Sequence, residues 1–248
     1  MAAAVALAMV GCGADDAPPT PGPPAVQRID IGSGERGAAV FRPAGVARPL
    51  PVVVCIHGLY ATDPETYGAW IRHIVREGYM VVYPTYQQGL TPPAAYLANT
   101  VAGVRAALAR LPVQRGRLVV AGHSAGGALA ADYAAAAGDL GVPSPRAVVA
   151  VYPGRALEGF PLRIPAADAT GIPRATRILA LAGADDRTVG ATTAREIVRD
   201  ATSVPRARRT FRLVNDPRVD YHLAPLRTDA VARRTFWAPL DRLLRQDP

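Results

Sequence analysis

Residues 117–127, RLVVAGHSAGG, join a short apolar run to a glycine-rich turn and the start of an alanine-rich stretch. The run 118–121 contains two valines and no polar residue, which is typical of a strand buried on both faces of a parallel sheet. The alanines of residues 128–137 favour a helix. A Gly-x-Ser-x-Gly turn between a strand and a helix is the setting that exposes a serine as a nucleophile, so Ser124 is the candidate nucleophile.

The two glycines of this turn, Gly122 and Gly126, leave room for the strand and the helix to pack closely together. The backbone N–H of Ala125 lies at the start of the predicted helix, where the helix dipole favours negative charge. An N–H in that place can stabilise the oxyanion that forms when a serine attacks a carbonyl group. We therefore expect Ala125 to supply one oxyanion donor.

The composition is that of a globular protein. The 248 residues fit one α/β domain, with 50% hydrophobic and 19% charged residues. The formal charge of +8 comes from 28 arginines, and no lysine is present. These arginines are scattered without interleaved aromatic residues, so we predict no nucleic-acid partner. The two cysteines and four histidines lack metal-ligand spacing, and we predict neither a metal nor a cofactor.

Residues 32–37, GSGERG, match the pattern Gly-x-Gly-x-x-Gly, but no helix follows them. The segments 26–31 and 38–42 on either side have the character of strands. The glycines therefore predict a hairpin turn rather than a dinucleotide-binding site.

The N-terminal residues 1–12 are mostly apolar, end in MVGC and resemble a secretory signal with a bacterial lipobox. On this interpretation Cys12 is lipidated and attaches the protein to a membrane, and residues 13–24 form a Pro-rich tether. Residues 25–248 then form the catalytic domain of a cell-envelope lipoprotein. The alternative is an unprocessed N-terminus on a secreted or cytoplasmic protein, because methionine replaces the usual leucine and no positive residue precedes the apolar run.

Strand candidates alternate with helix candidates along the chain, judged by apolar runs and by apolar residues at helical spacing. The predicted strands are 26–31, 38–42, 51–56, 79–83, 118–121, 147–152, 178–181 and 210–214. The predicted helices are 65–77, 94–110, 128–137, 191–200 and 228–245. This alternation predicts an α/β fold with a doubly wound, mostly parallel sheet, helices on both faces and a site at the carboxyl ends of the strands.

A serine hydroxyl needs a base to take its proton, and the base needs an acid to orient it. Asp185 and Asp186 closely follow the predicted strand 178–181, and both are candidates for the acid. His222 follows the last predicted strand and is the one histidine downstream of these aspartates. We therefore predict that His222 is the base.

The order of serine, aspartate and histidine resembles that of the α/β-hydrolase superfamily. The acid of that family commonly sits in a Gly-x-x-Asp-x-x-Val pattern, which Gly183, Asp186 and Val189 fit, so the resemblance favours Asp186 over Asp185. It also implies that His57-Gly58-Leu59 forms the oxyanion turn, with the Leu59 N–H as the second donor and His57 as a scaffold residue.

The resemblance implies a serine hydrolase that cleaves carboxylic esters of small molecules or polymers through an acyl-enzyme. Thioesterase and peptidase activities on the same triad stay open, as does a non-catalytic binding module of the same fold. The connection 155–176 is short and rich in proline, arginine and alanine, which predicts a minimal lid over an open site. We expect a monomer.

Overall fold

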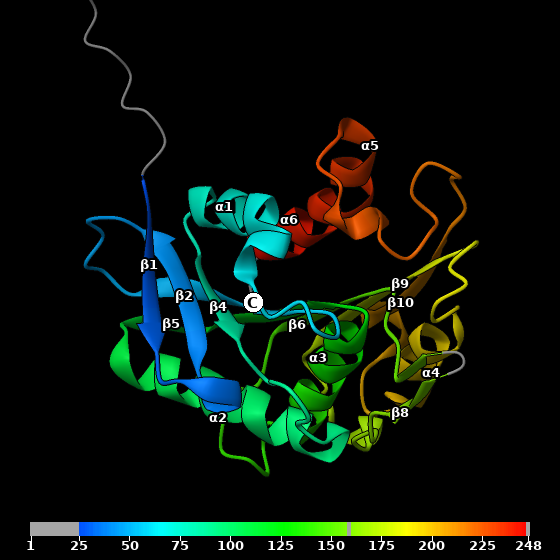
Figure 1. Ribbon diagram of the computed structural model, residues 1–248, viewed down its shortest axis with the longest axis horizontal. Helices are drawn as coiled ribbons and strands as arrows, with labels where there is room; N and C mark the ends of the chain where they lie inside the picture. The colour runs from blue at the N-terminus through cyan, green and yellow to red at the C-terminus, as the bar shows by residue number, and fades with distance from the viewer. Residues whose placement is uncertain (1–24, 158–159, 247–248) are drawn as a thin grey trace, which may run out of the picture.

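A computed structural model describes residues 25–157 and 160–246 of the chain. The predicted signal segment, the Pro-rich tether and Cys12 lie outside the described residues. An eight-stranded sheet runs through the centre of the structure in the order β1-β2-β4-β3-β5-β6-β9-β10 (Figure 1). Its strands are β1 (Val26–Ile31), β2 (Ala38–Pro43), β3 (Leu50–Ile56), β4 (Met80–Pro84), β5 (Val113–His123), β6 (Ala147–Val151), β9 (Arg177–Gly183) and β10 (Arg209–Val214).

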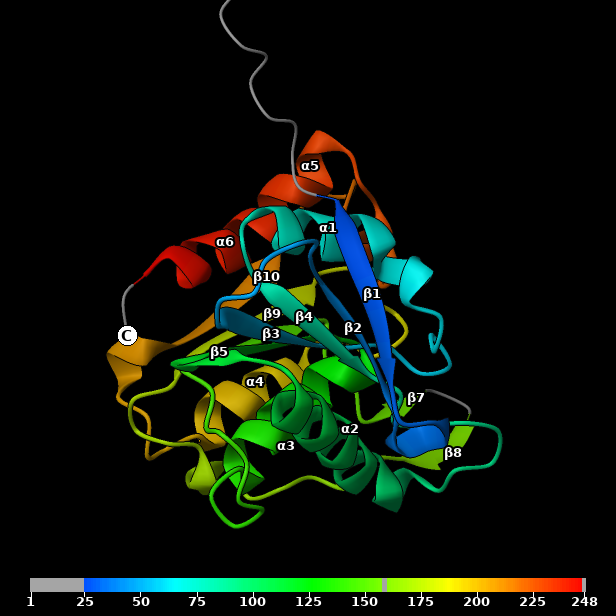
Figure 2. The same ribbon diagram turned by 90° about the vertical axis from the view of Figure 1, so that its left-hand side faces the viewer.

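Within the part of the sheet ordered β4-β3-β5-β6-β9-β10, every pair of adjacent strands is parallel. The exception is at one edge, where β1 and β2 pair antiparallel and β2 pairs antiparallel with β4 (Figure 2). The hairpin predicted at residues 32–37 is confirmed by the first of these pairings. The mostly parallel α/β fold predicted from the alternation of strands and helices is confirmed as well.

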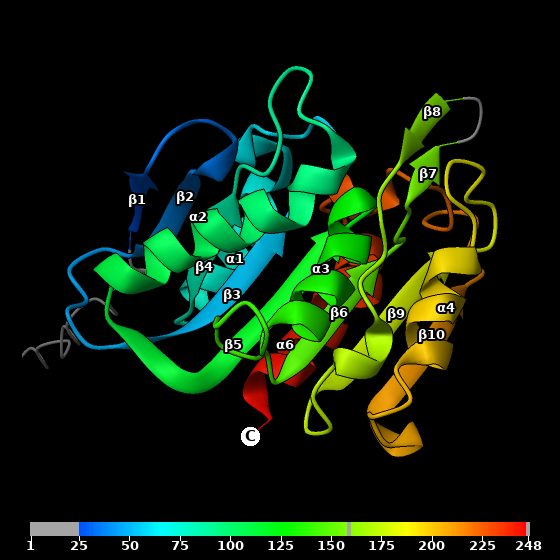
Figure 3. The same cartoon turned by 90° about the horizontal axis from the view of Figure 1, so that it is seen from below.

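Helices cover both faces of the sheet. They are α1 (Gly68–Arg76), α2 (Tyr96–Arg110), α3 (Ala125–Ala136), α4 (Thr192–Asp200), α5 (Ala230–Ala232) and α6 (Ala238–Arg245). Figure 3 shows α2, α3 and α4 in front of the sheet, and α1 and α6 lie on the opposite face. The predicted final helix 228–245 begins with α5 and continues through a π-helical turn, Arg233–Trp237, into α6.

The core is divided into two apolar layers by the sheet, because alternate side chains of a strand point to opposite faces. Along β3, Val52 and Val54 pack with α2 and α3, whereas Val53 and Cys55 pack with α1 and α6. Every residue of β3 is buried, as expected of a central strand in a parallel sheet. Burial raises the pKa of the Cys55 thiol to about 12, so this cysteine stays protonated and acts as a small apolar residue.

The connection between β6 and β9 contains a small hairpin that the sequence did not predict. Its strands β7 (Ala156–Leu157) and β8 (Phe160–Arg163) pair antiparallel, apart from the main sheet. The described residues of this connection add one short 3₁₀ turn, Ala169–Gly171, and no α-helix. Among all the described residues, no helix has the length and apolar character needed to cross a membrane.

Candidate active site

Ser124 lies on the sharp turn between β5 and α3, at the carboxyl end of a central strand. Its backbone has a φ of 56° and a ψ of −125°, and a positive φ is uncommon for a residue with a side chain. The Ser124 N–H donates to the Val151 carbonyl at 3.0 Å and ties this turn to the end of β6. Such strain is typical of functional positions that the surrounding structure holds in place.

The two glycines of the turn are required by close backbone contacts. A Cβ at Gly122 would lie 2.1 Å from the Gly126 carbonyl oxygen, and a Cβ at Gly126 would lie 2.0 Å from the Ile56 carbonyl oxygen. Neither position has room for a side chain, because both obstacles are backbone atoms. The glycines therefore let α3 approach β5, as the sequence pattern predicted, and also β3, which it did not predict.

The structure brings the three predicted residues of the triad together. The Ser124 hydroxyl lies 2.9 Å from Nε2 of His222, and Nδ1 of His222 lies 2.8 Å from Oδ2 of Asp186. A carboxylate only accepts hydrogen bonds, so Nδ1 carries the ring proton and Nε2 is free to accept the serine proton. This is the arrangement in which a histidine can act as a general base toward a serine.

Asp186 rather than Asp185 faces the histidine. Asp186 is 5% exposed, and its Oδ1 accepts hydrogen bonds from the backbone N–H groups of Thr188 at 3.0 Å and Val189 at 3.2 Å. Asp185 instead pairs with Arg187 at the surface, with an exposed side chain. The two backbone donors fix the Asp186 carboxylate so that its second oxygen points at His222.

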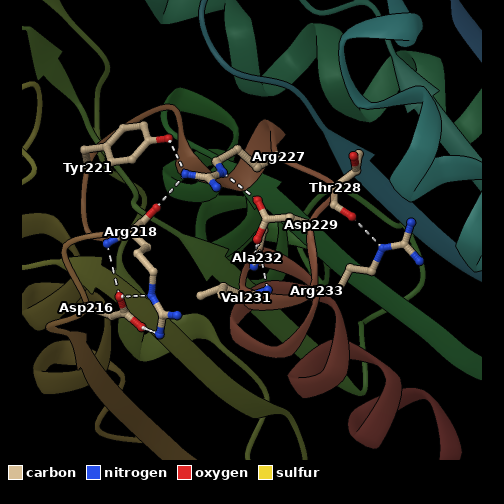
Figure 4. A network of polar contacts seen from close by, with 9 residues as sticks. All are labelled: Asp216, Arg218, Tyr221, Arg227, Thr228, Asp229, Val231, Ala232 and Arg233. Carbon is tan, nitrogen blue, oxygen red and sulfur yellow. Dashed lines mark hydrogen bonds and ion pairs between the residues drawn. The ribbon is translucent and has the colours of Figure 1, made fainter.

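The segment that carries His222 follows β10 and is held by a network centred on Arg227 (Figure 4). The Arg227 guanidinium donates to the Arg218 carbonyl at 2.9 Å and to the Tyr221 hydroxyl at 3.2 Å. It also pairs with Asp229 at 2.6 Å, whose carboxylate caps the start of α5. These contacts join the chain on both sides of His222 to the last helices, and they limit the movement of the histidine.

The predicted oxyanion turn lies against the serine, since a Cβ at Gly58 would be 3.4 Å from the Ser124 Cβ. The Gly58 N–H donates to the hydroxyl of Tyr67 at 3.1 Å, so it is already occupied. Within residues 25–157 and 160–246, the N–H groups of Leu59 and Ala125 donate to no other group. Ala125 is the donor predicted from the turn itself and Leu59 is the donor that the resemblance implied, whereas Tyr67 was not predicted to contribute to the site.

His57 is a buried part of the scaffold. Its ring stacks on Tyr86 with centroids 4.2 Å apart, and the Tyr86 hydroxyl donates to the His57 carbonyl at 3.0 Å. Burial lowers the pKa of His57 to about 4, although a hydrogen bond with the Gly58 carbonyl acts in the opposite direction. A neutral, stacked ring fits the scaffold role that the resemblance implied.

Large apolar side chains lie exposed on the loops around the triad. Tyr60 follows the oxyanion turn and is 60% exposed, and Leu223 follows the catalytic histidine and is 58% exposed. Tyr60 also has a φ of 61°, a second strained backbone position, two residues after Gly58. Because Tyr60 and Leu223 each follow a site residue in the chain, their exposed side chains are the candidate rim of the site.

No set of three or more histidine, cysteine, aspartate or glutamate side chains suited to a metal ion is present in the part of the chain that the structure describes. The arrangement at Ser124 uses a nucleophile, a base, an oriented acid and two backbone donors. Together these groups suit acyl transfer at a carbonyl carbon.

Comparisons with known proteins identify the fold family of the chain. A family model described as the alpha/beta hydrolase fold matches residues 53–207. No curated protein sequence matches the chain significantly.

Several solved structures share the fold. A thermostable esterase from Pseudomonas putida ECU1011 has a TM-score of 0.70 and 20% identity over 91% of this chain and 85% of that chain. The carboxyl esterase 2 of the mycorrhizal fungus Tuber melanosporum has a TM-score of 0.69 and 17% identity over 89% of this chain and 87% of that chain. The Pyrobaculum calidifontis esterase has a TM-score of 0.66 and 19% identity over 89% of this chain and 85% of that chain. At these identities the likeness shows the fold.

Proposed function

Because the chain belongs to the α/β-hydrolase fold family, we propose that it is a serine hydrolase that cleaves carboxylic esters through an acyl-enzyme. The observation that carries this proposal is the hydrogen-bonded series from Asp186 through His222 to Ser124. Each member has the partner that its role requires, and each is held by contacts of its own loop.

Acylation begins when Nε2 of His222 takes the proton of the Ser124 hydroxyl, as the oxygen attacks the carbonyl carbon of the ester. The carbonyl oxygen becomes an oxyanion and accepts hydrogen bonds from the backbone N–H groups of Leu59 and Ala125. Asp186 stabilises the imidazolium by accepting a hydrogen bond from its Nδ1–H, without taking the proton. The tetrahedral intermediate then expels the alcohol, which takes its proton from Nε2 and leaves the acyl group on Ser124.

Deacylation repeats these steps with water as the nucleophile. Nε2 of His222 takes a proton from water, and the resulting hydroxide attacks the acyl carbon. When the second intermediate collapses, the serine oxygen leaves and recovers its proton from His222. The products are a carboxylic acid, an alcohol and the unchanged enzyme.

Carboxylic esters are favoured as substrates for two reasons. Solved relatives that share the fold are named esterases, although their identity to this chain is only 17–20%. In addition, the exposed side chains of Tyr60 and Leu223 offer apolar contacts to the acyl or alcohol part of a substrate at an open site. Thioesters and peptides have the same electrophilic carbonyl and are the alternatives to be tested.

The proposal is tested by labelling with a fluorophosphonate probe and by turnover of matched ester, thioester and amide substrates. We expect Ser124 to be labelled, as shown by peptide mass analysis, and we expect esters to be the fastest class. A folded protein that neither reacts with the probe nor hydrolyses any of the three classes would instead be a binding module. Faster turnover of thioesters or amides would replace the proposed substrate class but keep the triad.

A further inference from the structure

We propose that His123 and Tyr67 are positioning residues that hold the base His222 in line with Ser124, an inference that rests on the proposed function. His123 precedes the nucleophile in the elbow, and its Nε2 lies 2.9 Å from the backbone carbonyl oxygen of His222. Its Nδ1 lies 2.9 Å from the hydroxyl of Tyr67. Both side chains act through His222 and not on the substrate.

The hydrogen-bond directions in this chain of contacts are fixed by the groups at its two ends. The His222 carbonyl can only accept, so Nε2 of His123 donates and, in a neutral ring, Nδ1 accepts. The Tyr67 hydroxyl then donates to Nδ1, and its oxygen accepts the N–H of Gly58 at 3.1 Å. Every hydrogen bond in the series therefore has one possible direction, which gives the network a single arrangement.

The network joins three loops that are distant in sequence. Gly58 lies in the oxyanion turn after β3, His123 is the last residue of β5 at the elbow, and His222 lies in the loop after β10. Tyr67, at the end of the 3₁₀ turn Pro64–Tyr67, completes the connection. The relative placement of the oxyanion donors, the nucleophile and the base thus depends on two side chains.

Burial keeps this network in one protonation state. His123 is 4% exposed and Tyr67 is 5% exposed. Burial, helped by the neighbouring His222, lowers the pKa of His123 to about 3. His123 therefore stays neutral while His222 gains a proton during each turnover, and its Nε2–H remains available to the carbonyl. The two rings lie 4.9 Å apart, so a charge on His123 would oppose the imidazolium of His222.

Loss of the contact would release the backbone of His222 on the side that faces the elbow. The histidine must keep hydrogen-bond distance to Ser124 and Asp186 at the same time, at 2.9 and 2.8 Å. A misplacement of about 1 Å in such a constellation can cost about 100-fold in rate. The substrate-binding rim would be unaffected, so the loss should fall on kcat and leave KM nearly unchanged.

The test compares three variants of the full chain, His123→Leu, His123→Gln and His123→Asn, with a p-nitrophenyl ester as substrate. Leucine makes neither hydrogen bond, and we expect it to lower kcat by about 100-fold with little change in KM. The amide nitrogen of glutamine reaches the position of Nε2 and can donate to the His222 carbonyl. Asparagine is too short and reaches only the position of Nδ1, next to Tyr67. We therefore expect glutamine to restore most of kcat and asparagine to restore little.

A matched control separates this effect from a loss of stability. His73→Leu also removes the contacts of a half-buried histidine, in this case to Asp241 at 3.0 Å and to the ring of Trp237. These contacts join α1 to α6 and to the π-helical turn before it, and they include no residue of the site. We expect this variant to lower Tm and to leave kcat unchanged.

A second measurement does not depend on turnover. The Nδ1 proton of His222 should give a downfield NMR resonance, which His123→Leu should broaden or shift and His123→Gln should restore. Equal recovery by glutamine and asparagine, or a His123→Leu variant that keeps both kcat and the resonance, would overturn the inference. A wild-type protein that shows the resonance but hydrolyses no ester would contradict the proposed function and leave the positioning role supported by the resonance of the variants.

Discussion

The exchange Asp186→Asn changes one atom of the triad, and the structure determines which way the new amide must face. Oδ1 of Asp186 accepts two backbone N–H groups, from Thr188 at 3.0 Å and Val189 at 3.2 Å. An amide nitrogen cannot accept them, so the asparagine oxygen takes this position. The NH₂ group then occupies the position of Oδ2, 2.8 Å from Nδ1 of His222.

An NH₂ group in that position only donates, so Nδ1 of His222 must become an acceptor. The ring proton moves to Nε2, where it faces the Ser124 hydroxyl at 2.9 Å. The serine proton then has no acceptor. A triad held in this wrong tautomer loses about 10⁴ in kcat, which corresponds to about 5.4 kcal/mol of transition-state stabilisation.

The assay is steady-state hydrolysis of a p-nitrophenyl ester, with Tm measured on the same preparations. Tm should change little, because both backbone contacts of Asp186 are preserved by asparagine. The matched control is Asp185→Asn, which removes only an exposed pair with Arg187 and should keep kcat within about 2-fold of the wild-type value. A variant at position 186 with more than a tenth of wild-type kcat, or a larger loss at position 185, would refute the assignment of the acid.

Three further changes test other parts of the site. Ser124→Ala should abolish fluorophosphonate labelling and lower kcat by about 10⁶-fold, and labelling of the variant would show that the probe reacts elsewhere. Gly126→Ala should lower the free energy of unfolding in urea by about 1–3 kcal/mol, because its Cβ would lie 2.0 Å from the Ile56 carbonyl oxygen. The control is Gly138→Ala, whose Cβ would have no atom within 4 Å and should cause no such loss. Below pH 6.5 the unfolded chain binds protons at His57 and His123, whereas the folded chain, with pKa values of about 4 and 3, does not. Stability should therefore fall as the pH falls from 6.5 toward 4, and His57→Phe should reduce this slope by up to about 1.4 kcal/mol per pH unit; an unchanged slope would contradict the argument.

The sequence predicted the parts of the fold that depend on local pattern. Continuous apolar runs identified the central parallel strands, and the Gly-x-Ser-x-Gly turn identified the elbow, because both are dictated by residues close together in the chain. Strand β5 nevertheless begins at Val113, five residues before the predicted run 118–121. Its first residues are partly exposed and mixed in polarity, so hydropathy does not distinguish them from a loop. The β7–β8 hairpin was missed for a similar reason, since its segment shows no clear alternation.

The parts of the site that were not predicted depend on contacts between distant residues. Tyr67 and His123 are 56 residues apart, and His123 and His222 are 99 residues apart. Nothing in the local sequence of Tyr67 separates it from the other core aromatic residues that pack beneath the site. The position of His123 directly before the nucleophile could have suggested a polar contact in the elbow. Its partner, the His222 carbonyl, becomes evident only when the loop after β10 is placed in space. The pairing of Asp186 with His222 is different, because its spacing from Gly183 and Val189 follows a pattern visible in the sequence.

Backbone strain at the site is supported by the sheet itself. In the described part of the chain, the non-glycine residues with positive φ are Tyr60, Ser124 and Tyr152, and they follow β3, β5 and β6. Each such position costs about 1–3 kcal/mol and persists only where the surroundings hold it. The Ser124 N–H donates to the Val151 carbonyl at the end of β6, and the Tyr152 N–H donates to the Leu181 carbonyl in β9. The strained turns at Ser124 and Tyr152 therefore continue the hydrogen bonding of β5 and β6 to the next strand. The buried parallel sheet does more than carry the loops, because its ladder extends into the elbow and fixes the nucleophile in a conformation that an isolated turn would not keep.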